Sequence, residues 1–134
     1  AVLLLDEPQQ RFLLLFVDYF MASAIRMGMD GLHLERPLTH DLFGILLRRL
    51  GAQVTRVTIT ELKDSTYFAL ITVQVNGAGE RTDFDARPSD ALAIAVRNET
   101  PIFAAAHLLK PIAEGMPLPG ERPRAPEPAP KGKT

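Results

Sequence analysis

Apolar and polar residues follow one another in blocks along the first 112 residues, and the spacing within each block predicts a type of secondary structure. Apolar positions at helical spacing predict three helices, over residues 19–30, 42–50 and 88–97. Short apolar or alternating runs predict strands, over residues 1–5, 12–17, 54–62, 66–75 and 80–86, with a short strand or edge at 101–104. These elements predict an α+β fold: a single domain with a mixed, mainly antiparallel β-sheet and three main packed helices.

Residues at the ends of these blocks predict where the elements begin and end. Asp18 and Thr39 are placed to cap the first and second helices, and Gly31 and Gly51 are placed to end them. Residues 76–77, an Asn-Gly pair, predict the turn of a hairpin. The third helix has almost no polar side, so we expect it to be largely buried.

The C-terminal residues differ in composition from the rest of the chain. Residues 111–134 hold seven of the eleven prolines, and large apolar residues are almost absent after Leu118. Such a segment buries too little surface to offset the entropy of ordering it. We therefore predict a folded domain over residues 1–112 and a Pro-rich disordered tail over residues 113–134.

Composition and charge narrow the classes of function. The chain has 134 residues, a formal net charge of −1 and no cysteine, which excludes disulfides, thiolate metal sites and a cysteine nucleophile. Because no basic excess is visible, a contact with nucleic acid would have to rest on a local site, a metal ion or an oligomer groove. No apolar run is long enough to span a bilayer, and no signal-like order of residues opens the sequence. We expect a cytoplasmic protein with no membrane partner.

Charged and hydroxylated residues concentrate where the strand over 80–86 meets the third helix. Alternation predicts that Asp83, Asp85 and Arg87 share one face of the strand. Ser89 and Asp90 follow in the first turn of the helix, which begins at a proline. These residues fit two interpretations: a functional site, or a solvated ladder of charges followed by an ordinary helix cap.

The functional interpretation is a metal site that acts on phosphodiesters. Carboxylates of Asp83, Asp85 and Asp90 would hold Mg²⁺ or Mn²⁺, which activates water and stabilises charge on a transferring phosphate. Arg87 would bind a phosphate oxygen, and Ser89 would donate a hydrogen bond to the substrate. Because Asp90 already places an anion at the helix N-terminus, a phosphate would need a cation to bridge it, which favours metal-assisted binding.

Two further candidates stand at the start of the second helix. His40 is one of three histidines and would act as a general base, with Asp41 beside it as a supporting acid or base. The alternative is that both are ordinary residues of the first helical turn. The catalytic candidates are therefore His40, Asp41, Asp85 and Asp90.

Two segments resemble the bifunctional nuclease domain family: residues 37–42, Pro-Leu-Thr-His-Asp-Leu, and residues 85–95, Asp-Ala-Arg-Pro-Ser-Asp-Ala-Leu-Ala-Ile-Ala. The order of the predicted elements is also similar to that of the family. The resemblance implies a nuclease that cleaves both DNA and RNA with little sequence preference and forms homodimers or higher oligomers. One residue departs from the pattern, because Met21 stands where the family carries a glutamate. If that glutamate serves the metal or the chemistry, this chain has lost activity, unless Asp18 replaces it.

A second function remains open beside the nuclease. The apolar residues of the helix over 42–50 nearly encircle it, which predicts that part of its surface is buried between subunits. Together with the balanced charge and Met21, this surface fits a non-catalytic oligomeric module that binds a ligand or a regulatory partner.

Overall fold

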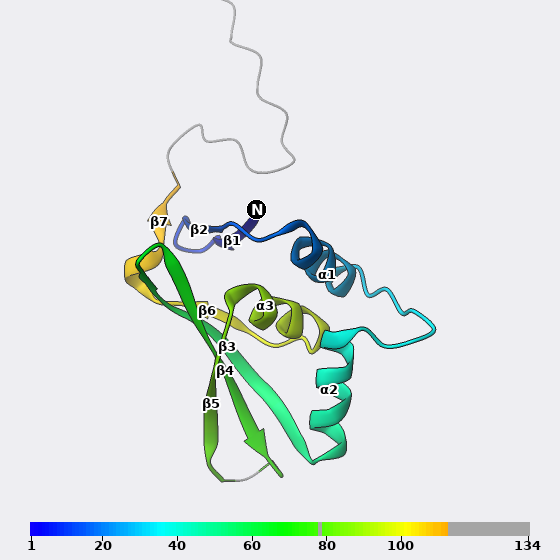
Figure 1. The fold of residues 1–134 in the computed structure, drawn as a ribbon. Coiled ribbons are helices and arrows are strands. Elements are labelled where there is room, and N and C mark those ends of the chain that lie inside the picture. The colour runs from blue at the N-terminus through cyan, green and yellow to red at the C-terminus, as the bar shows by residue number, and fades with distance from the viewer. Residues whose placement is uncertain (78, 113–134) are drawn as a thin grey trace, which may run out of the picture.

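A four-stranded sheet in the order β5-β4-β3-β6 supports the helices (Figure 1). Its strands β3 (Ala52–Lys63), β4 (Thr66–Val75) and β5 (Arg81–Ala86) form an antiparallel meander, and β6 (Ile102–Ala104) pairs with β3 in parallel. The computed structural model describes residues 1–77 and 79–112. The mixed, mainly antiparallel arrangement within a single α+β domain confirms the predicted fold class.

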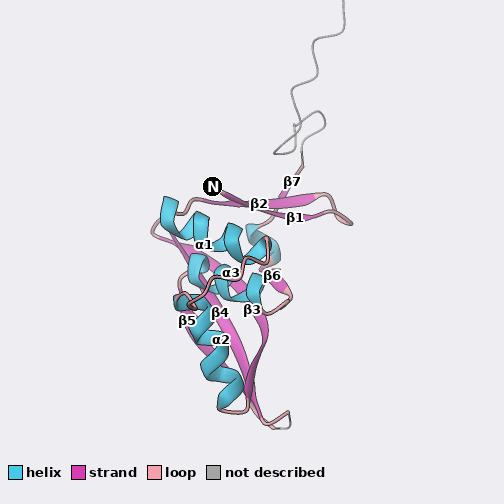
Figure 2. Cartoon of the chain, turned by 90° about the vertical axis from the view of Figure 1, so that its right-hand side faces the viewer, coloured by secondary structure: helices cyan, strands magenta, loops and turns pink. Residues whose placement is uncertain are grey.

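A second, smaller sheet is built from the two ends of the described chain. Its strands β1 (Val2–Asp6), β2 (Arg11–Leu15) and β7 (Lys110–Pro111) are all antiparallel. Figures 1 and 2 place this sheet at one end of the molecule and α2 at the other. The sequence predicted β1 and β2. It did not predict that they form a sheet of their own, in which β2 also pairs with β7.

Helix α3 (Pro88–Arg97) lies at the centre of the molecule, as its apolar sequence predicted. It packs against α1 (Tyr19–Met29), α2 (Thr39–Arg49) and strands β3 and β4. The small side chains of α3 allow this close approach, and the residues from Ala91 to Ala95 are all buried. The core continues into the large sheet, where Val57, Ile59 and Ala69 are fully covered. Each fully buried aliphatic side chain of Val or Ile size contributes about 1.5–3 kcal/mol to folding.

The starts of α1 and α2 show one correct and one wrong cap prediction. Oδ1 of Asp18 accepts a hydrogen bond from the Met21 N–H at 2.9 Å, so Asp18 is the N-cap of α1. Thr39 is not the N-cap of α2, because the cap is Leu38 and Thr39 is the first helical residue. Asp41 supplies the missing acceptor, since its Oδ2 accepts from the Leu38 N–H at 2.9 Å. An acidic residue at the third helical position therefore takes the capping role that we assigned to Thr39.

One prediction about the organisation of the chain concerns residues that the structure does not describe. The predicted disordered tail, 113–134, lies outside the described residues. No helix in the described part of the chain is long and apolar enough to cross a membrane.

Candidate functional site

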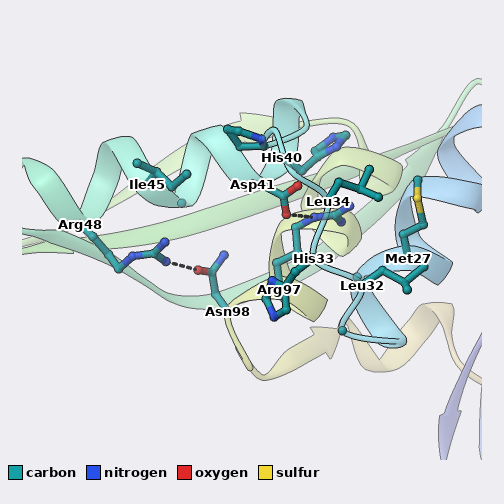
Figure 3. A pocket seen from close by; sticks show the side chains of 14 residues that line it. Met27, Leu32, His33, Leu34, His40, Asp41, Ile45, Arg48, Arg97 and Asn98 are labelled. Atoms are coloured by element: carbon teal, nitrogen blue, oxygen red, sulfur yellow. Dashed lines mark hydrogen bonds and ion pairs between the residues drawn. The ribbon is translucent and has the colours of Figure 1, made fainter.

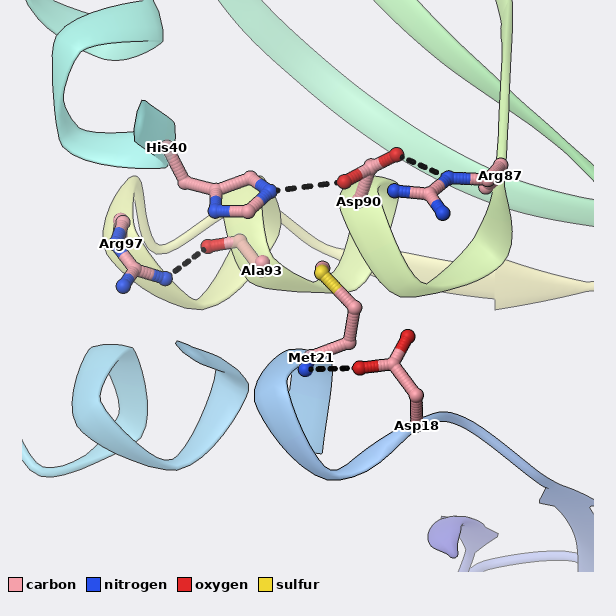
Figure 4. A network of polar contacts seen from close by, with 7 residues as sticks. All are labelled: Asp18, Met21, His40, Arg87, Asp90, Ala93 and Arg97. Atoms are coloured by element: carbon pink, nitrogen blue, oxygen red, sulfur yellow. Dashed lines mark hydrogen bonds and ion pairs between the residues drawn. The ribbon is translucent and has the colours of Figure 1, made fainter. Parts of the chain in front are cut away.

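The first turns of α2 and α3 meet at a hydrogen bond between His40 and Asp90 (Figure 4). Nε2 of His40 lies 2.9 Å from Oδ1 of Asp90, although the two residues are 50 positions apart in the chain. The His40 side chain is only 13% exposed, so the bond forms in a partly water-excluded place. Two of the four catalytic candidates from the sequence are thus direct partners.

Arg87 completes this cluster from the residue that precedes α3. Its Nε donates to Oδ2 of Asp90 at 2.7 Å, so the carboxylate of Asp90 bridges an imidazole and a guanidinium. Burial raises the pKa of Asp90, but the hydrogen bonds from Arg87 and His40 outweigh it and leave the pKa below its ordinary value. The hydrogen bond with Asp90 in turn raises the pKa of Arg87. We refer to His40, Arg87 and Asp90 as the His40 cluster.

The hydrogen bond to Asp90 determines which nitrogen of the His40 ring carries the proton. A carboxylate only accepts, so the shared proton sits on Nε2, and in the neutral ring Nδ1 then keeps its lone pair. Within the described part of the chain, Nδ1 makes no hydrogen bond and is not a fully buried atom. This is the arrangement of a general base held by a carboxylate.

Asp90 does not serve as the helix cap that the simpler interpretation of the sequence assigned to it. The N-cap of α3 is Arg87, and no side chain among the described residues caps this helix with a hydrogen bond. Asp90 is the third residue of α3, and its two oxygens are used by His40 and Arg87. Its charge still lies near the positive end of the helix dipole, which favours the ionised form.

Asp41 directly follows His40 in α2 but has a different set of partners (Figure 3). Its Oδ1 accepts from Nε of Arg97 at 2.8 Å, and its Oδ2 accepts from the Leu38 N–H. Burial raises the pKa of Asp41, but these two hydrogen bonds prevail and leave it lowered. Both oxygens therefore hold α2 in place, and neither points to a partner in the His40 cluster. A cavity of about 310 Å³ opens beside this pair.

The strand register separates Asp83 and Asp85 from Asp90. In the register between β4 and β5, Asp83 is opposite Thr72 and Asp85 is opposite Leu70. The β4 residues that alternate with Thr72 and Leu70 are buried and face the helices: Ala69, Ile71 and Val73. Oδ1 of Asp83 accepts from the Thr72 hydroxyl at 2.6 Å on the sheet face that turns away from α3. The alternation itself was predicted correctly, but the sequence could not show which face meets the helix.

The predicted metal site of Asp83, Asp85 and Asp90 is therefore not formed by these three side chains. Among residues 1–77 and 79–112, no three His, Asp or Glu side chains gather closely enough to hold a metal ion. Asp85 on β5 lines the cleft described below. Ser89, the other substrate-binding candidate, is only 9% exposed in the first turn of α3.

A largely apolar cleft of about 840 Å³ opens directly beside the His40 cluster. His40, Arg87 and Asp90 are themselves part of its lining. The walls come from α2, β4 and β5, with apolar side chains that include Leu42, Leu46, Ile71, Val73 and Phe84. Phe84 was not a candidate from the sequence, because one apolar residue in an alternating strand gives no local signal of a site.

Met21, at the position where we expected a family glutamate, faces α3 from α1 (Figure 4). Its side chain packs against the hydrophobic core. Asp18 has a structural role instead of replacing that glutamate, because its Oδ1 caps α1. Its charge does reach Arg87 and contributes to the raised pKa of that residue.

Comparison with known proteins gives a consistent set of matches. A model of the bifunctional nuclease domain matches residues 2–115. A protein of Mycobacterium tuberculosis (strain ATCC 25618 / H37Rv), described only as uncharacterized, is 37% identical over 103 residues, which cover 76% of this chain and 60% of that protein. Bifunctional nuclease 1 of Arabidopsis thaliana is 34% identical over 104 residues, which cover 76% of this chain and 32% of the plant protein. The chain thus spans less than two thirds of the length of these relatives.

Proposed function

The chain belongs to the bifunctional nuclease domain family, and from that premise we propose that it hydrolyses nucleic acid at the His40 cluster. The observation that carries the proposal is the 2.9 Å contact between Nε2 of His40 and Oδ1 of Asp90. In the neutral ring this contact leaves the lone pair on Nδ1 of His40, and Arg87 supplies a cation bound to the same carboxylate, so the cluster holds a base and a cationic side chain of the kinds that phosphodiester hydrolysis uses.

Each member of the cluster has a distinct role in the proposed reaction. Nδ1 of His40 takes a proton from water as the water oxygen bonds to phosphorus, and the leaving oxygen of the broken P–O bond takes a proton from solvent. Asp90 stabilises the imidazolium that forms. The terminal nitrogens of Arg87 bind phosphate oxygens, since only Nε of this residue is used by Asp90. A positioned general base of this kind contributes about 10²- to 10⁴-fold to the rate.

We propose that both RNA and DNA are substrates. Attack by water does not need a ribose 2′-hydroxyl, so the same step applies to either backbone. The groups of the His40 cluster would contact phosphate, which carries no sequence information directly, so little sequence preference is expected.

Dependence of the cleavage on Mg²⁺ or Mn²⁺ stays a prediction. We assign no residues as ligands of the metal. Arg87 and Asp90 neutralise each other, and Asp85 adds a negative charge near the cleft. An incoming phosphate would therefore gain from an additional cation. Because the described side chains do not form a three-ligand site, we route no step of the reaction through a metal.

We also propose that the protein forms homodimers or higher oligomers. Phe16, Tyr19 and Phe20 are largely exposed at the junction of β2 and α1, and Tyr19 and Phe20 stack edge to face with centroids 6.0 Å apart. Aromatic residues are enriched in the cores of protein interfaces, so this patch is the better candidate for a subunit contact than the wall of the cleft. A mass equal to one chain at micromolar concentration would count against it.

The decisive experiment compares cleavage by wild type and by His40→Gln. The glutamine amide can still donate to Asp90, but it cannot act as a base, so the fold is kept while the proposed chemistry is removed. Purified proteins are incubated with single-stranded RNA and duplex DNA, each with Mg²⁺, with Mn²⁺ and with chelator. We expect the variant to lose at least about 10²-fold in rate. The exposed Asp30→Asn serves as a matched control and should keep full activity.

Equal cleavage by wild type and His40→Gln would place the activity elsewhere. The second candidate, a non-catalytic binding module, is favoured by Met21 at the expected glutamate position. It predicts that wild type and variant bind an oligonucleotide equally and that neither cleaves it under any of the metal conditions.

A further inference from the structure

We propose that the apolar cleft beside the His40 cluster binds an unpaired nucleobase, with Phe84 as the surface on which the base stacks. This inference rests on the proposed function, since it names the part of the substrate that lies next to the phosphate held by Arg87. It makes single-stranded nucleic acid the preferred substrate class.

The lining of the cleft combines two kinds of chemistry. Arg87, Asp90 and His40 supply polar and charged groups, and the other walls are lined mostly by apolar side chains of α2 and β4. A nucleotide has the same two parts, a charged phosphate and a flat base with apolar faces. The cleft volume of about 840 Å³ falls within the range of about 300–1,000 Å³ common for ligand sites.

Phe84 stands where it can meet such a base. It lies on the edge strand β5, opposite Ile71, so its side chain faces the cleft rather than the outer sheet surface. It is 53% exposed, which is unusual for a phenylalanine whose strand neighbour Ile71 is buried. Ala86, the next residue on the same face, has a small side chain and leaves space between the ring and the cluster.

The spacing along the chain links the two parts of the site. Phe84 precedes Arg87 by three residues, which is roughly 10 Å between Cα atoms in an extended strand at about 3.3 Å per residue. Both side chains can therefore reach one nucleotide unit, the ring contacting a base and the guanidinium an adjoining phosphate. Stacking on aromatic side chains tolerates every base, which agrees with little sequence preference.

A base inside a duplex cannot enter the cleft without leaving its stack. Extruding it costs free energy, and this cost is smallest for a strand that is already single. We expect binding to favour single strands over duplexes of the same length.

The other possible occupant of the cleft is a second copy of this chain. Leu42 and Leu46 are half-exposed on the same wall, so an apolar subunit contact there would also cover Phe84. If a second copy fills the cleft, replacing Phe84 should lower the mass of the protein in solution to that of one chain. If a base fills it, the mass should not change.

The test measures binding of a fluorescent single-stranded DNA oligonucleotide by anisotropy, with every protein carrying His40→Gln to prevent cleavage. Phe84→Ala and Phe84→Leu should weaken binding by about 5- to 150-fold, because leucine keeps apolar bulk but offers no ring for stacking. Phe84→Trp should restore it. The control Phe103→Ala, which removes a half-exposed ring from β6, should leave binding unchanged. An oligonucleotide of abasic sites should bind weakly and equally to all these proteins.

Three results would overturn the proposal: equal binding by Phe84→Ala and its parent, full binding by Phe84→Leu, or a fall in mass to one chain caused by Phe84→Ala. Failure of the proposed chemistry can be told apart from these results. It would appear as unchanged cleavage by His40→Gln, independently of how the Phe84 variants bind.

Discussion

Nε of Arg97 donates a hydrogen bond to Oδ1 of Asp41 at 2.8 Å, and this contact ties the last turn of α3 to the first turn of α2 (Figure 3). The Arg97 side chain is only 9% exposed and also donates through Nη1 to the Ala93 carbonyl at 2.8 Å. Because Asp41 follows His40 directly, the contact fixes the helical turn that carries the proposed base.

Asp41→Ala should lower the free energy of unfolding by about 1–3 kcal/mol, because it leaves the buried guanidinium of Arg97 and the Leu38 N–H without their acceptors. Urea denaturation measures the change. The matched control is Asp30→Ala, which removes an exposed ion pair with Arg26 and should cost no more than about 1 kcal/mol. Equal losses in the two variants would show that the contact between α2 and α3 contributes nothing special.

Gly28→Ala should also destabilise the fold, although alanine is normally the better helix former by about 1 kcal/mol. A Cβ at Gly28 would lie 2.6 Å from Cγ2 of Val96 and 2.8 Å from Nη1 of Arg97, so α1 and α3 would have to move apart. Overpacking of this kind costs about 1–3 kcal/mol, which outweighs the gain in helix propensity.

Gly44→Ala provides the comparison within α2. There the nearest atom to the new Cβ is Oδ1 of the Asn98 side chain at 3.1 Å, which can shift. We expect Gly44→Ala to lie within about 1 kcal/mol of wild type, and thermal unfolding of both variants measures the difference. A stabilised Gly28→Ala would mean that the two helices have room to separate.

The order and type of the elements could be predicted because they depend on local spacing. The wide apolar face of α3 and the alternation in β4 are visible within a few turns or residues, and both predictions hold. The small sheet was not predicted, because β7 has two residues and forms only by pairing with β2 across most of the chain.

The sequence named the residues of the candidate site as candidates but did not predict how they are arranged. His40, Arg87 and Asp90 were all candidates, yet their contact joins residues 50 positions apart, and no local pattern encodes that. Asp83 was assigned to the same cluster because alternation placed it with Asp85. Which face of β5 turns to the helix follows from the register with β4, a non-local property.

Acid should weaken the fold in a defined range of pH. The pKa values of Asp41 and Asp90 both lie below the ordinary value of 3.8, because hydrogen bonds to their ionised forms outweigh burial. A lowered carboxyl pKa contributes stability that is present above the unfolded pKa and is lost as pH falls through the folded pKa. The free energy of unfolding should therefore be steady above about pH 5 and fall below about pH 4.

The contribution of these two carboxyls can be isolated with Asp41→Asn and Asp90→Asn, which cannot titrate. The double variant should be less stable at neutral pH but lose less stability between neutral pH and pH 3. Urea denaturation at several pH values gives both slopes. An equal loss in wild type and double variant would show that Asp41 and Asp90 do not cause the acid lability.

Arg87→Gln tests whether the guanidinium beside Asp90 meets a phosphate. Loss of one phosphate contact should weaken oligonucleotide binding uniformly across sequences and reduce the slope of log Kd against log salt by roughly 0.7 for a single strand. Arg56→Gln is the matched control, because Arg56 lies over the Phe103 ring, where β3 pairs with β6, and does not line the cleft. If Arg56→Gln changes the salt slope and Arg87→Gln does not, the nucleic acid crosses that part of the sheet instead, and the acidic charge around the His40 cluster would then act to repel the backbone.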